Sequence, residues 1–316
     1  MKSYPLDQCA LYKVTSKRRL TDILRIDLKR LTRLSQDEGN FNVFEMPEAI
    51  CPFTGKKTKA RWVQNPIPEL KDLHRRIQAL LNRVEVPAFC HGGTKGKSYR
   101  TNAAVHLMAP SVATFDLRSF FPSTSSKQVF GFFQHDLDCA PDVAGLLTDL
   151  CTYRRCLATG SPVSPILAYW ANRKLFETLN RRATEQHLMM SVYVDDVTIS
   201  GDLLPHRLAE QVDGIVKKYG HQLSVGKTRR FLPGDAKHVT GIVIKGGQLR
   251  VPFSRFHKAR AISAAIVAAP DDLTREVLTA KLGGLLGEAA YIDPRYKRWA
   301  EQTYAQLAAI RIRRRL

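Results

Sequence analysis

The sequence predicts an α+β protein, because strand-like runs in its middle part are followed by a helical end. Residues 112–115 form a short apolar run, and residues 188–200 form a longer one that two adjacent aspartates interrupt. Apolar, β-branched and aromatic runs of this kind are typical of strands, and the longer one has the pattern of a tight hairpin. From Ser254 onward the chain is rich in Ala and Leu, which favours helices. We therefore expect an antiparallel sheet backed by helices, with a helical segment after it.

The remaining elements follow in chain order. A helical pattern covers residues 20–34. After the first strand, apolar residues recur at helical spacing over residues 129–137, and Ser125 or Ser126 can cap the start of that helix. Residues 245–250 predict a hairpin turn that returns to a strand.

The charge of the chain suggests a polyanionic partner. Its 49 Lys and Arg against 29 Asp and Glu give a net charge of +20. In residues 54–100, eleven basic residues stand against three acidic ones. Any one of them can be a solvated surface charge, but together they favour binding to a nucleic-acid backbone.

Other patterns exclude several classes of protein. None of the six cysteines forms a C-x-x-C pair, which argues against structural zinc and for free thiols in a reducing compartment. No apolar run approaches the roughly 18 residues that span a bilayer, and the N-terminus lacks a signal-peptide pattern. We therefore expect a cytoplasmic protein with no membrane partner. Residues 226–228 (Gly-Lys-Thr) are not a P-loop, since His221 stands where that motif needs glycine.

The adjacent pair Asp195 and Asp196 is the most informative feature of the chain. Two neighbouring carboxylates repel each other and resist desolvation, so a bound cation is the natural means of keeping both ionised. Asp116, at the end of the predicted strand 112–115, can supply a third carboxylate. Oxygen ligands suit Mg²⁺, and two such ions about 4 Å apart can drive in-line phosphoryl transfer. The alternative is an exposed hairpin turn without a ligand.

Four segments resemble motifs A to D of a reverse transcriptase, in that family's order and spacing. They are Phe115-Asp116 with Phe121 (motif A), residues 157–165 (motif B), residues 193–196 (motif C) and residues 223–228 (motif D). Two more fit signatures of retron reverse transcriptases, namely residues 102–106 (N-A-x-x-H) and residues 239–241 (V-T-G). By this resemblance, over roughly residues 55 to 250, the chain is identified as a bacterial retron-type reverse transcriptase. Motif B departs from the family's usual Pro-Gln-Gly, with Ala158-Thr159-Gly160 in its place.

The resemblance implies a right-hand polymerase. Its parts would be an N-terminal helical extension (residues 1–55), fingers (56–110), a palm with the active site (111–250) and a helical thumb that recognises RNA (251–316). Two Mg²⁺ ions would be the cofactors.

The resemblance also implies roles for single residues. Catalysis would depend on Asp116, Asp195, Asp196 and Lys227, and the ions would be held by the three aspartates and the carbonyl of Leu117. Lys227 would stabilise or protonate the pyrophosphate, or else is a loop lysine. Phe121 would lie under the sugar and select dNTPs, although the neighbouring Phe120 could take that role.

Other residues would bind the substrates. The nucleotide site would include Thr159 and Gly160 beside Phe121, and primer or template would meet Tyr193, Arg61 and Lys71. RNA would meet Asn102, His106, Arg255, Lys258 and Arg260. Asn102 and His106 could instead be structural, with Asn102 bonded to the imidazole ring or to the backbone.

The implied function is an RNA-directed DNA polymerase that copies part of its own structured noncoding RNA from dNTPs. Priming from a guanosine 2′-hydroxyl would give a branched RNA–DNA hybrid (msDNA), within an antiphage system that includes an effector protein from the same locus. One alternative is another bacterial reverse transcriptase, of group II intron or diversity-generating type. A further alternative is a non-catalytic RNA scaffold that holds an effector, which the presence of all three aspartates disfavours.

Overall fold

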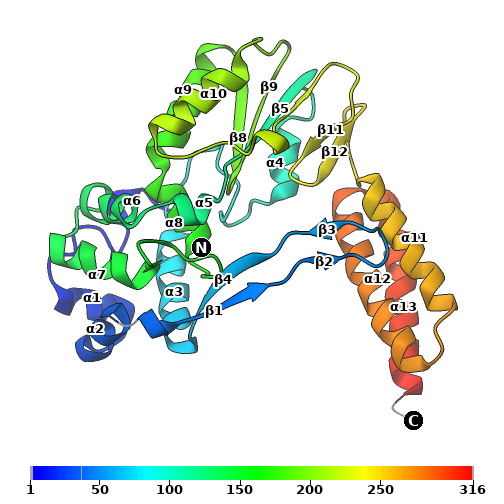
Figure 1. The fold of residues 1–316 in the computed structure, drawn as a ribbon, viewed down its shortest axis with the longest axis horizontal. Coiled ribbons are helices and arrows are strands. Elements are labelled where there is room, and N and C mark those ends of the chain that lie inside the picture. Colours follow the sequence, from blue (N-terminus) through cyan, green and yellow to red (C-terminus); the bar gives the residue numbers. More distant parts are fainter. Residues whose placement is uncertain (1–2, 37, 315–316) are drawn as a thin grey trace. The chain divides into compact units, whose positions relative to one another are not determined.

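The computed structural model describes residues 3–36 and 38–314 and confirms an α+β fold with antiparallel sheets (Figure 1). The described chain divides into two compact units. The first comprises the chain up to Met46 together with Arg61–Pro233, and the second comprises Pro47–Ala60 together with the chain from Gly234 onward. These two units are defined by contacts within the chain, and they do not test the predicted division into fingers, palm and thumb. That division stays a prediction.

The first unit is built around a sheet, called here the central sheet, with strand order β10-β5-β9-β8. Its strands are antiparallel neighbours, and they are β5 (Ser111–Asp116), β8 (Met189–Tyr193), β9 (Asp196–Gly201) and β10 (Arg229–Phe231). Helices α4 (Tyr99–Val105) and α9 (Arg173–Glu185) pack against β8 (Figure 1). The inner strands β5 and β9 are buried almost throughout, which explains the apolar run of residues 112–115.

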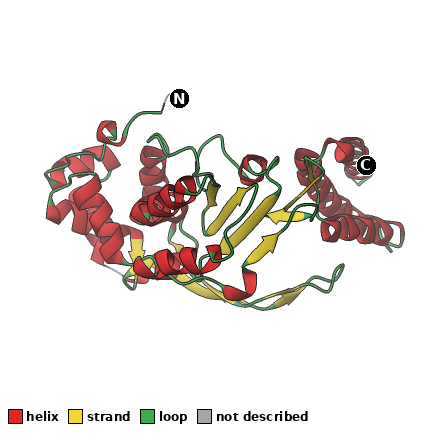
Figure 2. Ribbon diagram, turned by 90° about the horizontal axis from the view of Figure 1, so that it is seen from above, coloured by secondary structure: helices red, strands yellow, loops and turns green. Residues whose placement is uncertain are grey.

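The other elements of the first unit surround this sheet (Figure 2). The helices are α1 (Lys17–Leu24), α2 (Leu28–Gln36), α3 (Pro68–Leu81), α5 (Phe120–Ser123), α6 (Ser126–Gly131), α7 (Pro141–Cys151), α8 (Ser164–Ala171) and α10 (Leu208–Lys218). Short helical turns are Leu6–Gln8, Glu38–Asn40, Val225–Lys227 and the π-helical Phe132–Asp136. Strand β1 (Phe41–Met46) pairs with β4 (Arg61–Pro66), and β6 (Thr152–Tyr153) pairs with β7 (Cys156–Leu157). Of the two serines predicted as a cap, Ser125 caps α6, because its hydroxyl accepts a hydrogen bond from the amide of Gln128.

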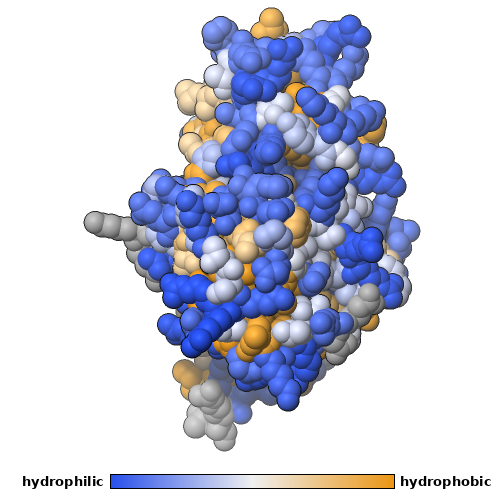
Figure 3. All heavy atoms as spheres, turned by 90° about the vertical axis from the view of Figure 1, so that its left-hand side faces the viewer, coloured by the Kyte–Doolittle hydropathy of each residue, from blue (hydrophilic) through white to orange (hydrophobic). Residues whose placement is uncertain are grey.

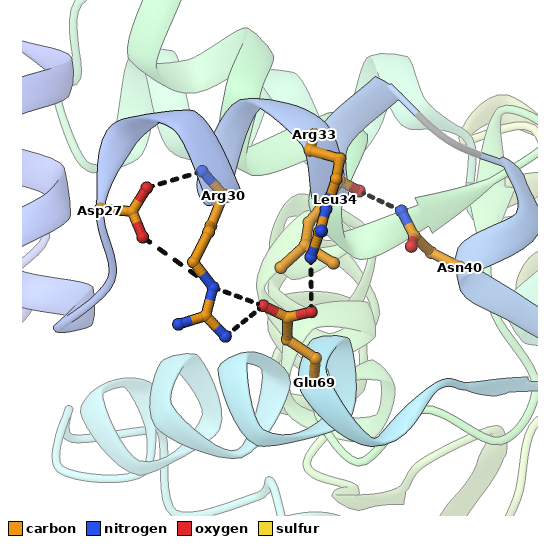
Figure 4. Close-up of polar contacts among 6 residues, drawn as sticks. All are labelled: Asp27, Arg30, Arg33, Leu34, Asn40 and Glu69. Carbon is orange, nitrogen blue, oxygen red and sulfur yellow. Dashed lines mark hydrogen bonds and ion pairs between the residues drawn. The ribbon is translucent and has the colours of Figure 1, made fainter.

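The N-terminal helices share the core of the central sheet, since Leu20 and Leu31 are fully buried in it. Glu69 at the start of α3 holds α2 in register through ion pairs with Arg30 at 2.6 Å and Arg33 at 2.7 Å (Figure 4). Ion pairs this exposed contribute little stability on their own. Burial of the leucines therefore holds α1 and α2 in place, and Glu69 adds a polar link between α2 and α3.

The face shown in Figure 3 is mainly hydrophilic, with hydrophobic residues in smaller areas between. No helix in the described ranges is long and apolar enough to cross a membrane. All six cysteines, each within the described chain, are free thiols.

The second unit combines a small sheet with a helical bundle. It contains β2 (Ala49–Ile50), β3 (Lys57–Thr58), β11 (Lys237–Val239), β12 (Ile242–Lys245), β13 (Gln248–Arg250), α11 (Phe253–Val267), α12 (Asp272–Ile292), a short turn Pro294–Tyr296 and α13 (Lys297–Arg313). The predicted hairpin at residues 245–250 is confirmed, with Gly246 and Gly247 both at positive φ as a type I′ turn requires. The predicted helical end is confirmed as well. The β2–β3 hairpin packs against this bundle, with Phe53 on its apolar core.

Candidate active site

The register of the central sheet brings the acidic residues together. Asp116, the last residue of β5, is the direct cross-strand partner of Asp196, the first residue of β9. The Cβ atoms of such a pair lie about 5 Å apart. The amide of Leu117 donates to the carbonyl of Asp195 at 2.9 Å, which ties the end of β5 to the β8–β9 turn. Residues some eighty positions apart in the sequence thus form one site, called here the acidic cluster (Asp116, Asp195 and Asp196).

The β8–β9 turn differs from the predicted one by one residue. The two aspartates were expected to be its central residues, but Tyr193 pairs with Asp196, so the central residues are Val194 and Asp195. The pairing of β9 with β5 explains this shift. Asp116 lies opposite Asp196, so β9 begins at Asp196 and the turn ends one residue earlier. Val194 consequently has φ 61°, which is unusual for a β-branched residue.

Burial and mutual repulsion dominate the electrostatics of the acidic cluster. Burial, then the charges of Asp195 and Asp116, raise the pKa of Asp196 to about 7. Burial likewise raises the pKa of Asp195, with Asp116 adding to the effect. Lys227 opposes this charge, since its Nζ donates to Asp116 Oδ1 at 2.6 Å, and that hydrogen bond raises the pKa of Lys227. The structure thus places Lys227 beside Asp116, and its role at the pyrophosphate stays a prediction.

The acidic cluster has the chemistry of a site for a divalent cation. Among residues 3–36 and 38–314, no three His, Cys, Asp or Glu side chains are arranged to hold an ion as they stand. The donors are nevertheless hard carboxylate oxygens that repel one another, buried at Asp116 and half-buried at Asp195 and Asp196, and their charge exceeds that of Lys227. Such a set suits Mg²⁺, whose charge would relieve the repulsion. The residues present therefore fit the cofactor.

Phe120 and Phe121 lie differently beside the acidic cluster. Phe120 is buried and packs edge-on against Phe176, with ring centroids 5.9 Å apart. Phe121 remains half-exposed at the edge of the core. The structure thus favours Phe121 over Phe120 for contact with a substrate.

Motif B is hydrogen-bonded to strand β4. The amide of Thr159 donates to the Gln64 side-chain oxygen at 2.9 Å, and the amide of Gln64 donates to the Thr159 carbonyl at 3.2 Å. A Cβ on Gly160 would lie 2.9 Å from Val63 Cγ1 and 3.0 Å from the Gln64 carbonyl, so this approach requires glycine. The sequence did not single out Gln64, although it lies within residues 56–110, the predicted fingers.

No family model matches the chain. Three curated relatives are similar to it. The retron Se72 reverse transcriptase of Salmonella heidelberg is 29% identical over 247 residues, 74% of this chain and 63% of the relative. The retron Ec86 enzyme of Escherichia coli is 27% identical over 242 residues, 74% of this chain and 75% of the relative. The retron Mx162 enzyme of Myxococcus xanthus is 28% identical over 238 residues, 65% of this chain and 49% of the relative.

By sequence, the chain is thus similar to several retron reverse transcriptases at 27–29% identity. It spans about half to three quarters of the length of these relatives. That kinship supports RNA-directed DNA polymerase activity, and reverse transcriptases generally depend on divalent metal ions.

The N-A-x-x-H signature of retron reverse transcriptases is buried here. Both ring nitrogens of His106 are hydrogen-bonded, Nδ1 to Ser200 Oγ at 2.6 Å and Nε2 to Ser191 Oγ at 2.7 Å. Burial lowers the pKa of His106 to about 3, so the ring is neutral. Asn102 is also fully buried. Any influence of these two residues on RNA would therefore be indirect, through the placement of α4 on the central sheet.

The V-T-G signature forms the turn between β11 and β12 in the second unit. Thr240 and Gly241 have positive φ, and a Cβ on Gly241 would lie 3.1 Å from Arg255 Nη2. Arg255 is itself paired with Glu288 at 2.8 Å. Lys258 lies one helical turn from Arg255, whereas Arg260 is exposed on a different face of α11. The structure thus does not gather Arg255, Lys258 and Arg260 on one surface.

The residues predicted to contact primer or template lie in the first unit. Tyr193 is half-buried at the end of β8, where burial and then the charge of Asp196 raise its pKa. Arg61 is exposed at the start of β4. Lys71 on α3 donates to Asn65 Oδ1 at 2.9 Å. Only Tyr193 of these adjoins the acidic cluster, and all three roles stay predictions.

Proposed function

We propose that this chain is an RNA-directed DNA polymerase that reverse-transcribes part of a cognate structured noncoding RNA. The observation that carries the proposal is the strand register that pairs Asp116 with Asp196 and places Asp195 in the turn beside them. Similarity to retron reverse transcriptases supports the same activity.

The acidic cluster, with the carbonyl of Leu117 as a further ligand, would hold two Mg²⁺ ions. Bound there, the ions would lower the pKa of the attacking hydroxyl and neutralise charge on the triphosphate. Burial of the carboxylates favours this binding, because charge interactions are stronger where water is excluded.

Lys227 is proposed to act at the triphosphate. The hydrogen bond to Asp116 raises its pKa, so Lys227 is protonated at neutral pH. Its side chain is 68% exposed, and its Nζ can therefore turn from Asp116 Oδ1 to a bound phosphate. There it would donate a hydrogen bond or a proton to the leaving pyrophosphate.

Phe121 is proposed to select the sugar. Its half-exposed ring would exclude a 2′-hydroxyl, while the buried Phe120 behind it supports its position. The Thr159 and Gly160 backbone, held by Gln64, would shape the rest of the nucleotide site.

The wider proposal covers architecture and partners. Residues 56–110 would be the fingers, 111–250 the palm and 251–316 an RNA-recognising thumb of a right-hand polymerase, after an N-terminal extension at 1–55. Priming from a guanosine 2′-hydroxyl would give branched msDNA. The enzyme would serve antiphage defence with an effector protein from the same locus. The names of its relatives support the retron part of this proposal.

The test is synthesis by the purified protein, co-expressed with the RNA transcribed beside its gene and supplied with dNTPs and Mg²⁺. We expect DNA joined to RNA through a branch, which a 2′,5′-debranching enzyme releases. Asp116→Asn protein serves as the control. DNA primed only from a 3′-hydroxyl would favour another class of bacterial reverse transcriptase, and RNA binding without any synthesis would favour a scaffold.

A further inference from the structure

The turn that carries Asp195 has an unfavourable backbone conformation. Val194 has φ 61°, in the left-handed region where a branched Cβ meets the backbone. Strain of this kind persists only where the surrounding structure imposes it. Residues 193–196, called here the acidic turn, are therefore held in place by their surroundings in the first unit.

A loop formed by residues 87–97, called here the clamp loop, is hydrogen-bonded to the strand that leads into the acidic turn. The amide of Val192 donates to the carbonyl of Phe89 at 2.8 Å. The carbonyl of Val192 accepts from the amides of His91 at 2.8 Å and Gly92 at 3.3 Å. The clamp loop thus fixes the backbone of β8 two residues before Val194.

Gly92 brings the clamp loop into direct contact with the acidic turn. A Cβ on Gly92 would lie 2.2 Å from the Val194 amide nitrogen, 2.8 Å from Val194 Cγ2 and 2.9 Å from the Tyr193 carbonyl carbon. Two of these atoms are backbone, so a larger residue must displace the turn itself. The next residue, Gly93, has φ 68°, and a Cβ there would lie 3.3 Å from the backbone of Ile166 in α8. The clamp loop therefore lies between the acidic turn and α8, the helix that begins in motif B.

Lys97 holds the clamp loop in its shape. Its Nζ donates to the carbonyls of Cys90 at 2.7 Å, Ala88 at 2.8 Å and Pro87 at 3.3 Å. An ammonium group has three donors, and here all three are directed at one short stretch of backbone. Without Lys97 the carbonyls would lose these partners, and the loop would be free to move away from Val194.

We propose that Gly92 and Lys97 are positioning residues for the reaction. Gly92 allows the clamp loop to press against Val194, Lys97 keeps the loop there, and together they hold the acidic turn so that Asp195 and Asp196 meet Asp116. The inference rests on the proposed function, because it assigns the purpose of the clamp loop to the aspartates that would bind metal.

Gly92→Ala tests the contact itself. We expect kcat for extension of an annealed primer–template to fall about 100-fold, since displacements near 1 Å have effects of that size. Affinity for the primer–template should change by no more than about threefold, because the basic surface is untouched. Gly145→Ala on α7 is the matched control, since a Cβ there meets nothing within 4 Å.

A second pair of variants tests the support. Lys97→Met should lower kcat in the same way but less, whereas Lys174→Met, at an exposed lysine of α9 outside the clamp loop, should leave kcat unchanged. Adding Val194→Gly to Gly92→Ala should recover part of the lost rate. Glycine adopts φ 61° freely and removes the Cγ2 contact, so the turn can adjust to the new Cβ.

Hydrogen exchange of the Val192 amide supplies a readout that does not depend on activity. It should accelerate about tenfold or more in Gly92→Ala and Lys97→Met relative to their controls. Unchanged exchange, a wild-type kcat in Gly92→Ala, or a double variant no better than Gly92→Ala would each overturn the proposal. Failure of the wild type to make any DNA would instead contradict the proposed function, and exchange would still decide the role of the clamp loop. If Gly92→Ala does not fold, Lys97→Met decides alone.

Discussion

The central sheet carries two polar clusters of opposite character, one fully buried and the other partly exposed. In the histidine cluster (His106, Ser191 and Ser200) both ring nitrogens have hydrogen-bond partners, and burial keeps the ring neutral. In the acidic cluster the carboxylates repel one another, and Lys227 bonds only Asp116. A buried polar group with all its partners stabilises a fold, whereas buried charge left uncompensated lowers stability and is kept for function. Within one sheet, the histidine cluster thus stabilises the fold, whereas the acidic cluster is suited to chemistry.

The largest expected effect is on synthesis. Asp195→Asn should reduce DNA synthesis at least about 1,000-fold, because several kcal/mol of charge stabilisation are lost with one carboxylate. RNA affinity, measured by filter binding, should stay near that of the wild type. Extension of a primed template at nearly the wild-type rate would remove Asp195 from the catalytic group.

The histidine cluster should respond in stability instead. His106→Ala leaves Ser191 and Ser200 without their partner and opens a cavity, so we expect a loss of about 2–4 kcal/mol in the free energy of unfolding. Urea denaturation measures this. RNA affinity of the folded variant should be unchanged, and a selective loss of RNA binding at full stability would instead favour the direct RNA contact predicted from the sequence.

Phe120 and Phe121 offer the same comparison between a structural and a functional side chain. Phe121→Ala should relax discrimination against rNTPs about 100-fold, by analogy with the limits of steric selection in apolar pockets. Primer extension with dNTP and rNTP in parallel measures this. Phe120→Ala should chiefly destabilise the fold, since its ring is in the core. If Phe120→Ala altered sugar selection and Phe121→Ala did not, the two roles would be exchanged.

The two clusters should also give opposite pH dependences in metal-free buffer. The pKa of Asp196 is raised from 3.8 to about 7, so its ionisation costs stability as pH rises through that range. The pKa of His106 is lowered from 6.5 to about 3, so its contribution is present above 6.5 and is lost as pH falls towards 3. The advantage of Asp196→Asn over the wild type should therefore grow from pH 4 to 7, and the deficit of His106→Ala should shrink from pH 6.5 downward. Urea unfolding across this range tests both, and parallel curves would contradict the assignment.

The smallest effect concerns RNA. Arg260→Ala should lower the salt dependence of RNA binding by nearly one phosphate contact, because Arg260 is exposed on α11. Arg255→Ala should mainly destabilise the second unit, since Arg255 is paired with Glu288. A titration over a salt series distinguishes them, and an unchanged slope in both would assign RNA binding to other residues.

Local patterns in the sequence predicted local structure well. The strand ending at Asp116, the Ser125 cap and the Gly246-Gly247 turn each depend on neighbouring residues, and all are confirmed. The missed features depend on contacts between distant segments. The one-residue shift of the acidic turn follows from pairing with β5, and the Gln64 contact follows from the approach of β4 to motif B.

The clamp loop belongs to the same class of missed features. The contact of Gly92 with Val194 could not be predicted from local patterns, because it joins segments about a hundred residues apart.

The β2–β3 hairpin belongs to the second unit, although it is distant in the sequence from the rest of that unit. Phe53, carried by residues 47–60, packs on a core formed by residues of α11 to α13, and Lys281 lies over its ring at 5.3 Å. The second unit is therefore built from two pieces that residues 61–233 separate in the sequence. A chimera that exchanged only the residues from 234 onward would join a foreign bundle to the original Phe53. Exchange of this unit between relatives, whether by recombination or by design, is expected to give a folded protein only when residues 47–60 and the residues from 234 onward are replaced together.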